Sequence, residues 1–123
     1  MGELYYKDLS YKISGLLFDV YNYLGPKLKE ETYCKYLQDL LKENNVDHQY
    51  QYYLKLNNNK NFVGKRYLDF LIEDKIVVEM KVGKRFFGKD FAQVKEYLEL
   101  CDMRLGLLVL FNYDGVKIHR VLN

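Results

Sequence analysis

Three charged residues interrupt two apolar segments near the middle of the chain. Asp69 lies in the segment YLDFLI, and Glu79 and Lys81 lie in the segment IVVEMKV, with three polar residues, 73–75, between the segments. A charged group in an apolar strand is costly unless it is paired, faces a cleft or binds a metal. The three charges are therefore the first candidates for chemistry, and the rest of the chain is expected to position them.

The pairing of these two segments decides whether the charges meet. Residues two apart on a strand point to the same face, so Glu79 and Lys81 project together. A hairpin turn of three residues would place Asp69 opposite Glu79, whereas a turn of two residues would place Asp69 opposite Val78. The sequence leaves both registers open, and only the first brings the two carboxylates to one face.

A metal ion would account for two carboxylates at one place. Opposed side chains on paired strands have Cβ atoms roughly 4.5–5.5 Å apart, and two carboxylates that close repel unless a cation lies between them or one is protonated. Asp69, Glu79 and the backbone carbonyl of Met80 could supply the oxygen ligands that Mg²⁺ or Mn²⁺ takes. Lys81 could orient a water molecule and stabilise charge on a phosphate, which suits phosphodiester hydrolysis. The alternative is that Glu79 and Lys81 are only neighbours on a solvent-exposed strand face.

Basic residues flank this central hairpin. Lys65 and Arg66 precede its first strand, and Lys84, Arg85 and Lys89 follow its second. Such residues could hold nucleic-acid phosphates near a metal. The net charge of only +2 argues against strong unspecific binding to nucleic acid.

The hydrophobic pattern predicts one α/β domain over residues 1–123, with a mixed β-sheet flanked by helices. Gly25-Pro26 is expected to end the first helix, and Asp90 with Gln93 fits a helix N-cap and its capping-box partner. The helix before the fourth strand predicts a parallel crossover. Asn57–Asn61 is expected to form a turn, and Gly64 is expected to mark a bulge. The order is ααβββαββ, with helices at 9–24, 29–43 and 90–101 and strands at 46–56, 62–72, 76–82, 105–111 and 116–122.

The composition excludes several classes of protein. No apolar run approaches the roughly 18 residues of a membrane span, and the N-terminal residues lack the pattern of a secretory signal, so a cytoplasmic protein is expected. Cys34 and Cys101 fall on helical apolar patterns and are interpreted as reduced core thiols. His48 and His119 have no partner at metal-ligand spacing and are interpreted as structural.

Taken together, these segments resemble the GxxExxY proteins, a family of the PD-(D/E)xK nuclease superfamily. The resemblance spans Leu9 to Asn123 and rests on LSYKISGLLFDVYNYLGP, KLKEETY, the Asp69 and Glu79-Met80-Lys81 strands, AQVKEYL, RLGLLVLFN and IHRVLN. It implies a restriction endonuclease-like core in which Asp69, Glu79 and Lys81 form the active-site signature.

The resemblance also implies accessory site residues on two helices. Glu30, in the Glu-x-x-Tyr motif with Tyr33, would be a further acid of the site, and Gln93 would face it. On the residues alone, Glu30 could equally serve the helix dipole, Gln93 could close the capping box, and Tyr33 is expected to pack. The chain departs from the family pattern at Lys27, where the motif has glycine, and at Leu68, where the superfamily name has proline.

The expected function is Mg²⁺-dependent hydrolysis of nucleic acid, with DNA the favoured substrate. The alternative is a non-catalytic module that keeps the nuclease fold to bind nucleic acid or protein, since fold does not fix function. On symmetry grounds alone, a single-domain nuclease acting on both strands of a duplex would work as a homodimer.

Overall fold

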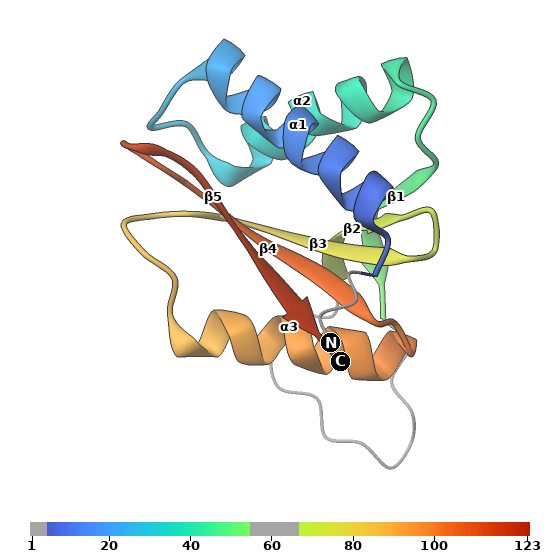
Figure 1. Cartoon of the computed structure of the whole chain (residues 1–123). Coiled ribbons are helices and arrows are strands. Elements are labelled where there is room, and N and C mark those ends of the chain that lie inside the picture. Colours follow the sequence, from blue (N-terminus) through green and yellow to red (C-terminus); the bar gives the residue numbers. More distant parts are fainter. Residues whose placement is uncertain (1–4, 55–66) are drawn as a thin grey trace.

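The computed structural model describes residues 5–54 and 67–123, which form three layers (Figure 1). A central sheet is covered by helices α1 and α2 on one face and by helix α3 on the other. The elements are α1 (Lys7–Leu24), α2 (Glu30–Glu43), β1 (His48–Tyr53), β2 (Tyr67–Ile72), β3 (Ile76–Val82), α3 (Gly88–Cys101), β4 (Leu105–Asn112) and β5 (Gly115–Leu122). The predicted α/β class and the order ααβββαββ are confirmed.

The sheet has the strand order β1-β2-β3-β4-β5. All neighbouring strands are antiparallel except β3 and β4, which are parallel and are joined through α3. This is the predicted crossover, because a parallel connection needs a long link and a helix supplies it. The carboxyl ends of β3 and β4 therefore lie at the same edge of the sheet.

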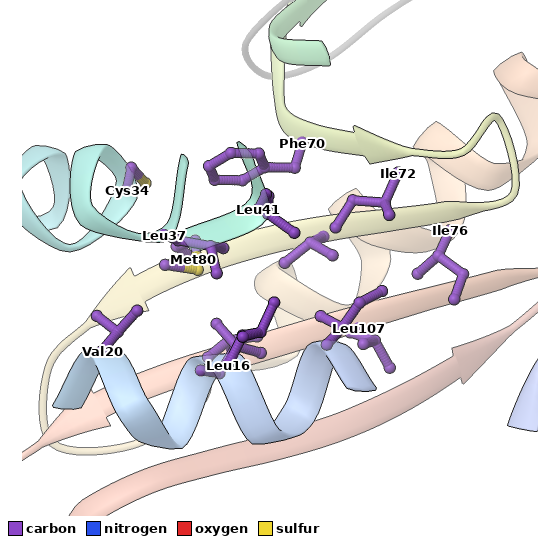
Figure 2. Packing of buried hydrophobic residues seen from close by; sticks show 14 of the residues in the cluster. Leu16, Val20, Cys34, Leu37, Leu41, Phe70, Ile72, Ile76, Met80 and Leu107 are labelled. Carbon is purple, nitrogen blue, oxygen red and sulfur yellow. The ribbon is translucent and has the colours of Figure 1, made fainter. Parts of the chain in front are cut away.

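The three central strands are buried on both faces. Beneath α1 and α2, side chains such as Leu37, Ile72 and Met80 pack into one cluster (Figure 2), and Val77 and Leu108 pack with α3 on the opposite face. Full burial of a Leu, Ile, Val or Met side chain contributes roughly 1.5–3 kcal/mol relative to exposure. Any charge on these strands is therefore held in a rigid apolar surrounding.

The end of α1 at Gly25 is as predicted, and α2 also ends at a residue type that tolerates the left-handed conformation. Gly25 ends α1 with φ +77°, and Asn45 follows α2 with φ +56°, conformations that glycine and asparagine adopt more readily than other residues. The predicted N-cap at Asp90 is wrong. The helix α3 begins two residues earlier, at Gly88, so Asp90 is its third residue.

The strand β1 departs from the regular alternation of side chains along a strand. Tyr50 contacts the cluster beneath α1 and α2, whereas Tyr52 contacts the cluster on the α3 face, although residues two apart were expected to share a face. Gln51 between them has φ +54°, which reverses the alternation locally. The predicted turn at Asn57–Asn61, the bulge at Gly64, and Lys65 and Arg66 lie outside the described residues.

Within the two described segments, no helix is long and apolar enough to span a membrane.

Candidate active site

A three-residue turn sets the register of the β2–β3 hairpin. Glu73 and Asp74 both have positive φ, 51° and 53°, as in the primed turns that suit hairpins. The N–H of Lys75 donates a 2.9 Å hydrogen bond to the carbonyl of Ile72, and Ile72 pairs with Ile76. Of the two registers left open by the sequence, this is the one that brings the carboxylates of the hairpin together.

The two carboxylates cross-link β2 and β3 where the backbone ladder stops. The last ladder pair is Phe70 with Val78. At the next position the N–H of Asp69 donates to Oε1 of Glu79 at 2.8 Å, and the N–H of Met80 donates to Oδ2 of Asp69 at 2.7 Å. Side-chain oxygens thus replace carbonyl oxygens as acceptors, which holds both acids at one point between the strands. Asp69 is 7% exposed and Glu79 is fully buried.

The irregular residue of β1 lies beside this point. Tyr50 pairs with Phe70 and Tyr52 with Leu68, so Gln51, with its positive φ, lies opposite Asp69. The residues on either side of Asp69 also contact opposite core clusters, as Tyr50 and Tyr52 do. A bend of the two-stranded pair is therefore centred on the acid that the sequence singled out. Backbone irregularities of this kind re-aim side chains next to functional sites.

Lys81 joins the carboxylates to α3. Its Nζ lies 3.9 Å from Oε2 of Glu79 and 3.9 Å from Oδ1 of Asp90, and it donates a 3.2 Å hydrogen bond to Oε1 of Gln93. Only 24% of the Lys81 side chain is exposed. The amide of Gln93 is therefore directed at Lys81, and the alternative capping-box role with Asp90 is not present.

Asp90 is a charged member of this group that the sequence interpretation misassigned. Its Oδ2 accepts the N–H of Phe87 at 2.9 Å, which satisfies a donor at the start of α3, and its Oδ1 faces Lys81. Phe87 and Asp90 have the spacing of an N-cap and its partner three residues later. That signal was hidden because phenylalanine carries no side-chain acceptor, so it is not an N-cap type.

Glu30 begins α2 at a place fixed by Tyr33. The hydroxyl of Tyr33 donates to the carbonyl of Gly25 at 2.6 Å and accepts the N–H of Leu28 at 3.3 Å. Its ring stacks on Phe111 with centroids 4.2 Å apart and an interplanar angle of 2°. Tyr33 therefore packs, as expected, and it ties the α1–α2 connection to β4 so that the start of α2 has a defined position.

Lys27 has φ +70° in that connection. This left-handed conformation brings Cβ close to the following carbonyl in every residue except glycine. Lys27 occupies the position at which the Gly-x-x-Glu-x-x-Tyr motif has glycine. Lys27 therefore differs from the motif in its side chain only, since its backbone keeps the conformation that favours glycine.

Tyr50 lies among the acids of β2 and α2. Burial raises the pKa of Tyr50 to about 12, with further contributions from the charges of Cys34, Asp69, Glu31 and Glu30. The charges of Asp69 and Glu30, from a strand and a helix, therefore act on the same phenol. The hydroxyl of Tyr50 stays protonated at neutral pH and is available as a donor. Sequence alone does not single out Tyr50, because nothing local shows its acidic neighbours.

The oxygen donors at the hairpin fit a hard divalent cation. In a strand, the N–H and C=O of one residue point to the same neighbouring strand, so the carbonyl of Met80 faces the side from which Asp69 accepts its N–H. Among residues 5–54 and 67–123, no group of three or more His, Cys, Asp or Glu side chains is placed to hold a metal. Two carboxylates and a carbonyl are enough for Mg²⁺, which keeps several waters and binds through one or two carboxylates plus substrate phosphate.

Three of the predicted phosphate-binding residues follow β3. Lys84, Arg85 and Lys89 are exposed. The guanidinium of Arg85 and the ammonium of Lys89 lie 5.2 Å and 5.9 Å from the ring centroid of Phe87, which is 48% exposed. Positive charge and an aromatic face are therefore presented together at the start of α3, next to Asp90 and Lys81.

Comparisons with known proteins agree with this architecture. A solved structure titled "Crystal structure of SSO0001" is similar to the chain, with a TM-score of 0.56 and 23% sequence identity. The match covers 96% of this chain and 57% of that chain, so this chain spans little more than half the length of its structural relative; the likeness shows a shared fold. No curated protein matches the sequence. A family model described as the PD-(D/E)XK nuclease superfamily matches residues 7–121, nearly the whole chain, and the protein therefore belongs to that superfamily.

Proposed function

We propose that the protein hydrolyses phosphodiester bonds of nucleic acid, DNA in the first place, with a bound Mg²⁺ or Mn²⁺ ion. The observation that carries the proposal is the grouping of Asp69, Glu79 and Lys81 at one end of the β2–β3 hairpin. The two buried acids are cross-linked between the strands, and Nζ of Lys81 lies 3.9 Å from Glu79. A protein that only bound nucleic acid would have no need to bury two acids beside a lysine.

Each residue has a role that follows from its contacts. Asp69, Glu79 and the carbonyl of Met80 would hold the cation, which, when bound, supplies Lewis-acid polarisation of a phosphate oxygen and an activated water. Lys81 can donate to a phosphate oxygen that gains negative charge in the transition state. Gln93 orients Lys81 through the 3.2 Å hydrogen bond to its ammonium.

Glu30 is proposed as a third acid that approaches from α2. Its charge and that of Glu31 contribute to the raised pKa of Tyr50, as the charge of Asp69 does, which supports a position of the start of α2 near the hairpin. We further place the chain in the GxxExxY group of the superfamily, because Tyr33 and the left-handed residue at Lys27 fix the start of α2. A homodimer, which would present two such sites to a duplex, follows from symmetry alone.

The test combines cleavage with a metal-binding readout. Single-stranded, duplex and branched DNA, and RNA, are incubated with the protein in Mg²⁺ or Mn²⁺. Lys81→Met should lower the cleavage rate about 10²–10³-fold, as loss of one transition-state donor does. The matched control is Lys95→Met, an exposed lysine on α3 that should leave the rate unchanged.

Metal binding is measured without substrate. A cation at ten times its Kd stabilises the folded protein by about 1.4 kcal/mol, which raises Tm by roughly 3–7 °C for a domain of this size. Asp69→Asn and Glu79→Gln should abolish that increase, and Lys95→Met should keep it. Cleavage that persists in EDTA, or that survives Asp69→Asn and Lys81→Met, would refute the proposal. Nucleic-acid binding with no cleavage of any substrate would favour the non-catalytic module instead.

A further inference from the structure

A small pocket lies at the edge of the sheet where β3 and β4 end. Its volume is about 290 Å³. Its lining comes from Lys27 in the α1–α2 connection, from Val82 at the end of β3 and the next two residues, and from Phe111 to Asp114 at the β4–β5 turn. Figure 1 shows these three connections together on the left edge of the molecule. The lining of the pocket thus begins at the residue that directly follows Lys81, and of its residues only Lys84 has a site role given above.

The walls of this edge pocket are held in place by hydrogen bonds. The hydroxyl of Tyr21 donates to the carbonyl oxygens of Asn112 and Tyr113, at 2.8 Å and 3.0 Å. The N–H of Gly83 donates to the carbonyl of Phe111 at 3.2 Å, which joins the loop after β3 to β4. Two of the three connections are therefore tied to the core, as in binding sites that are formed before their ligand arrives.

The side chains of the edge pocket combine an aromatic ring with positive charge. Tyr113 is 67% exposed, and the ammonium of Lys27 lies 4.6 Å from its ring centroid. Lys84 is exposed on the opposite connection. Among the described lining residues, these two lysines are set against one carboxylate, Asp114, which leaves one net positive charge. Aromatic rings beside basic groups bind single-stranded nucleic acids, because every base has a face that can stack.

We propose that the edge pocket binds one unpaired nucleotide of the substrate, with its base against Tyr113 and its phosphate near Lys27 and Lys84. This proposal rests on the function proposed above and names the kind of substrate. The volume lies at the lower end of the roughly 300–1,000 Å³ of small-molecule sites, so the pocket takes a single nucleoside and not a duplex groove. A base in a duplex is covered by its neighbours and must leave the stack to enter.

The position of the edge pocket relates this nucleotide to the bond that is cut. A strand advances about 3.3 Å per residue, and Val82 and Gly83 follow Lys81 directly. Because the lining of the pocket begins at the residue after Lys81, the nucleotide in the pocket is expected to lie near the phosphate held at Lys81. Substrates with an unpaired nucleotide next to the cut, such as overhangs, flaps and branches, are expected to be preferred over blunt duplex.

The test measures binding in Mg²⁺ with Lys81→Met as the parent protein, so that cleavage is slow, and repeats the measurement in EDTA. The probe is an eight-nucleotide single strand that carries one 2-aminopurine. Its affinity for the protein is compared with that of a blunt duplex of the same sequence. Tyr113→Ala should weaken single-strand binding about 5- to 150-fold, the usual effect of removing one stacking ring. Tyr113→Phe keeps the ring and should remain within about twofold of the parent protein. Tyr11→Ala, which removes an 82% exposed tyrosine of α1, should have no effect.

Three outcomes would overturn the proposal of the edge pocket. The first is no binding of the single strand in either Mg²⁺ or EDTA. The second is equal loss of affinity for Tyr113→Ala and Tyr113→Phe, and the third is an equal effect of Tyr113→Ala on single strand and duplex. Failure of the nuclease proposal is seen separately, because it appears as absent or metal-independent cleavage. A protein that cleaves through Lys81 but binds single strands normally after Tyr113→Ala refutes the edge pocket alone.

Discussion

The positive φ of Lys27 predicts that glycine is better than alanine at this position by about 0.5–1 kcal/mol of unfolding free energy. A left-handed residue with a Cβ costs roughly 1–2 kcal/mol. Glycine removes that cost, but its greater freedom in the unfolded chain offsets about 0.4–1 kcal/mol. Both substitutions also lose the contact of the Lys27 ammonium with Tyr113, worth about 0.5–1 kcal/mol at an exposed site. The difference in unfolding free energy between the two variants therefore reports the effect of the backbone conformation alone.

The measurement is urea unfolding of Lys27→Gly and Lys27→Ala. With m-values of about 1–3 kcal/mol/M, the glycine variant should unfold at a midpoint about 0.2–1 M higher than the alanine variant. Relative to the unaltered protein, Lys27→Ala should be less stable and Lys27→Gly should be nearly unchanged.

A second pair of variants provides the matched control. Lys35 is an exposed residue inside α2, where glycine is about 1 kcal/mol worse than alanine. Lys35→Gly should therefore be the less stable of its pair, which is the opposite sign to that at Lys27. If alanine is better than glycine at both positions, the left-handed conformation of Lys27 is wrong, and so is the explanation of the motif's glycine.

Three further predictions concern the supports of the site. Gly106→Ala would place its Cβ 2.6 Å from Cγ1 of Val94 on α3, and should cost about 1–3 kcal/mol of unfolding free energy; Val94→Ala should recover part of this loss, whereas additive losses would refute the clash. Because the pKa of Tyr50 is raised from 10.0 to about 12, the folded state holds its proton more tightly, so stability should fall between about pH 10 and pH 12. Tyr50→Phe should remove this component of stability, and the difference in phenolate absorbance between the unaltered protein and Tyr50→Phe should show a step near pH 12. A difference step near pH 10 would contradict the raised pKa of Tyr50. Asp90→Ala should lower stability by about 1 kcal/mol in urea unfolding by leaving the N–H of Phe87 without its acceptor, and an unchanged midpoint would contradict that role.

The central hairpin could be predicted from sequence because its signals are local. An apolar run from Ile76 to Val82 lies between a polar turn and a basic loop, and β3 has these bounds in the structure. A turn of two or of three residues gives two possible registers of the hairpin, and the two differ in the face to which each side chain points. Sequence could not choose between them. The positive φ of Glu73 and Asp74, with Lys75 as an extra residue, decides the register.

Other parts of the site depend on contacts between distant segments. Tyr50 acquires its acidic neighbours only when the start of α2 packs near β1 and β2, and no pattern within β1 shows this. The reversed alternation at Gln51 was equally hidden, because glutamine is not a residue type that marks positive φ. The pairing of Gln93 with Lys81 follows from the crossover, which brings the first turns of α3 over the end of β3.

The charges of the assembled site bear on whether it acts as an enzyme or only as a binding module. Asp69, Glu79 and Asp90 are acidic and Lys81 is basic, so these four side chains carry a net charge of −2 when ionised. Two of the three acids, Asp69 and Glu79, lie between strands of an apolar sheet, where water screens charge poorly. A phosphodiester approaching this group without a cation would be repelled, whereas a divalent cation would reverse the sign of the interaction. Nucleic-acid affinity that came only from the exposed basic loop would not increase with Mg²⁺, because the cation competes with lysine and arginine for phosphates. Affinity that increases with Mg²⁺ at constant ionic strength, and loses this increase in Asp69→Asn, would place the phosphate at the acids themselves.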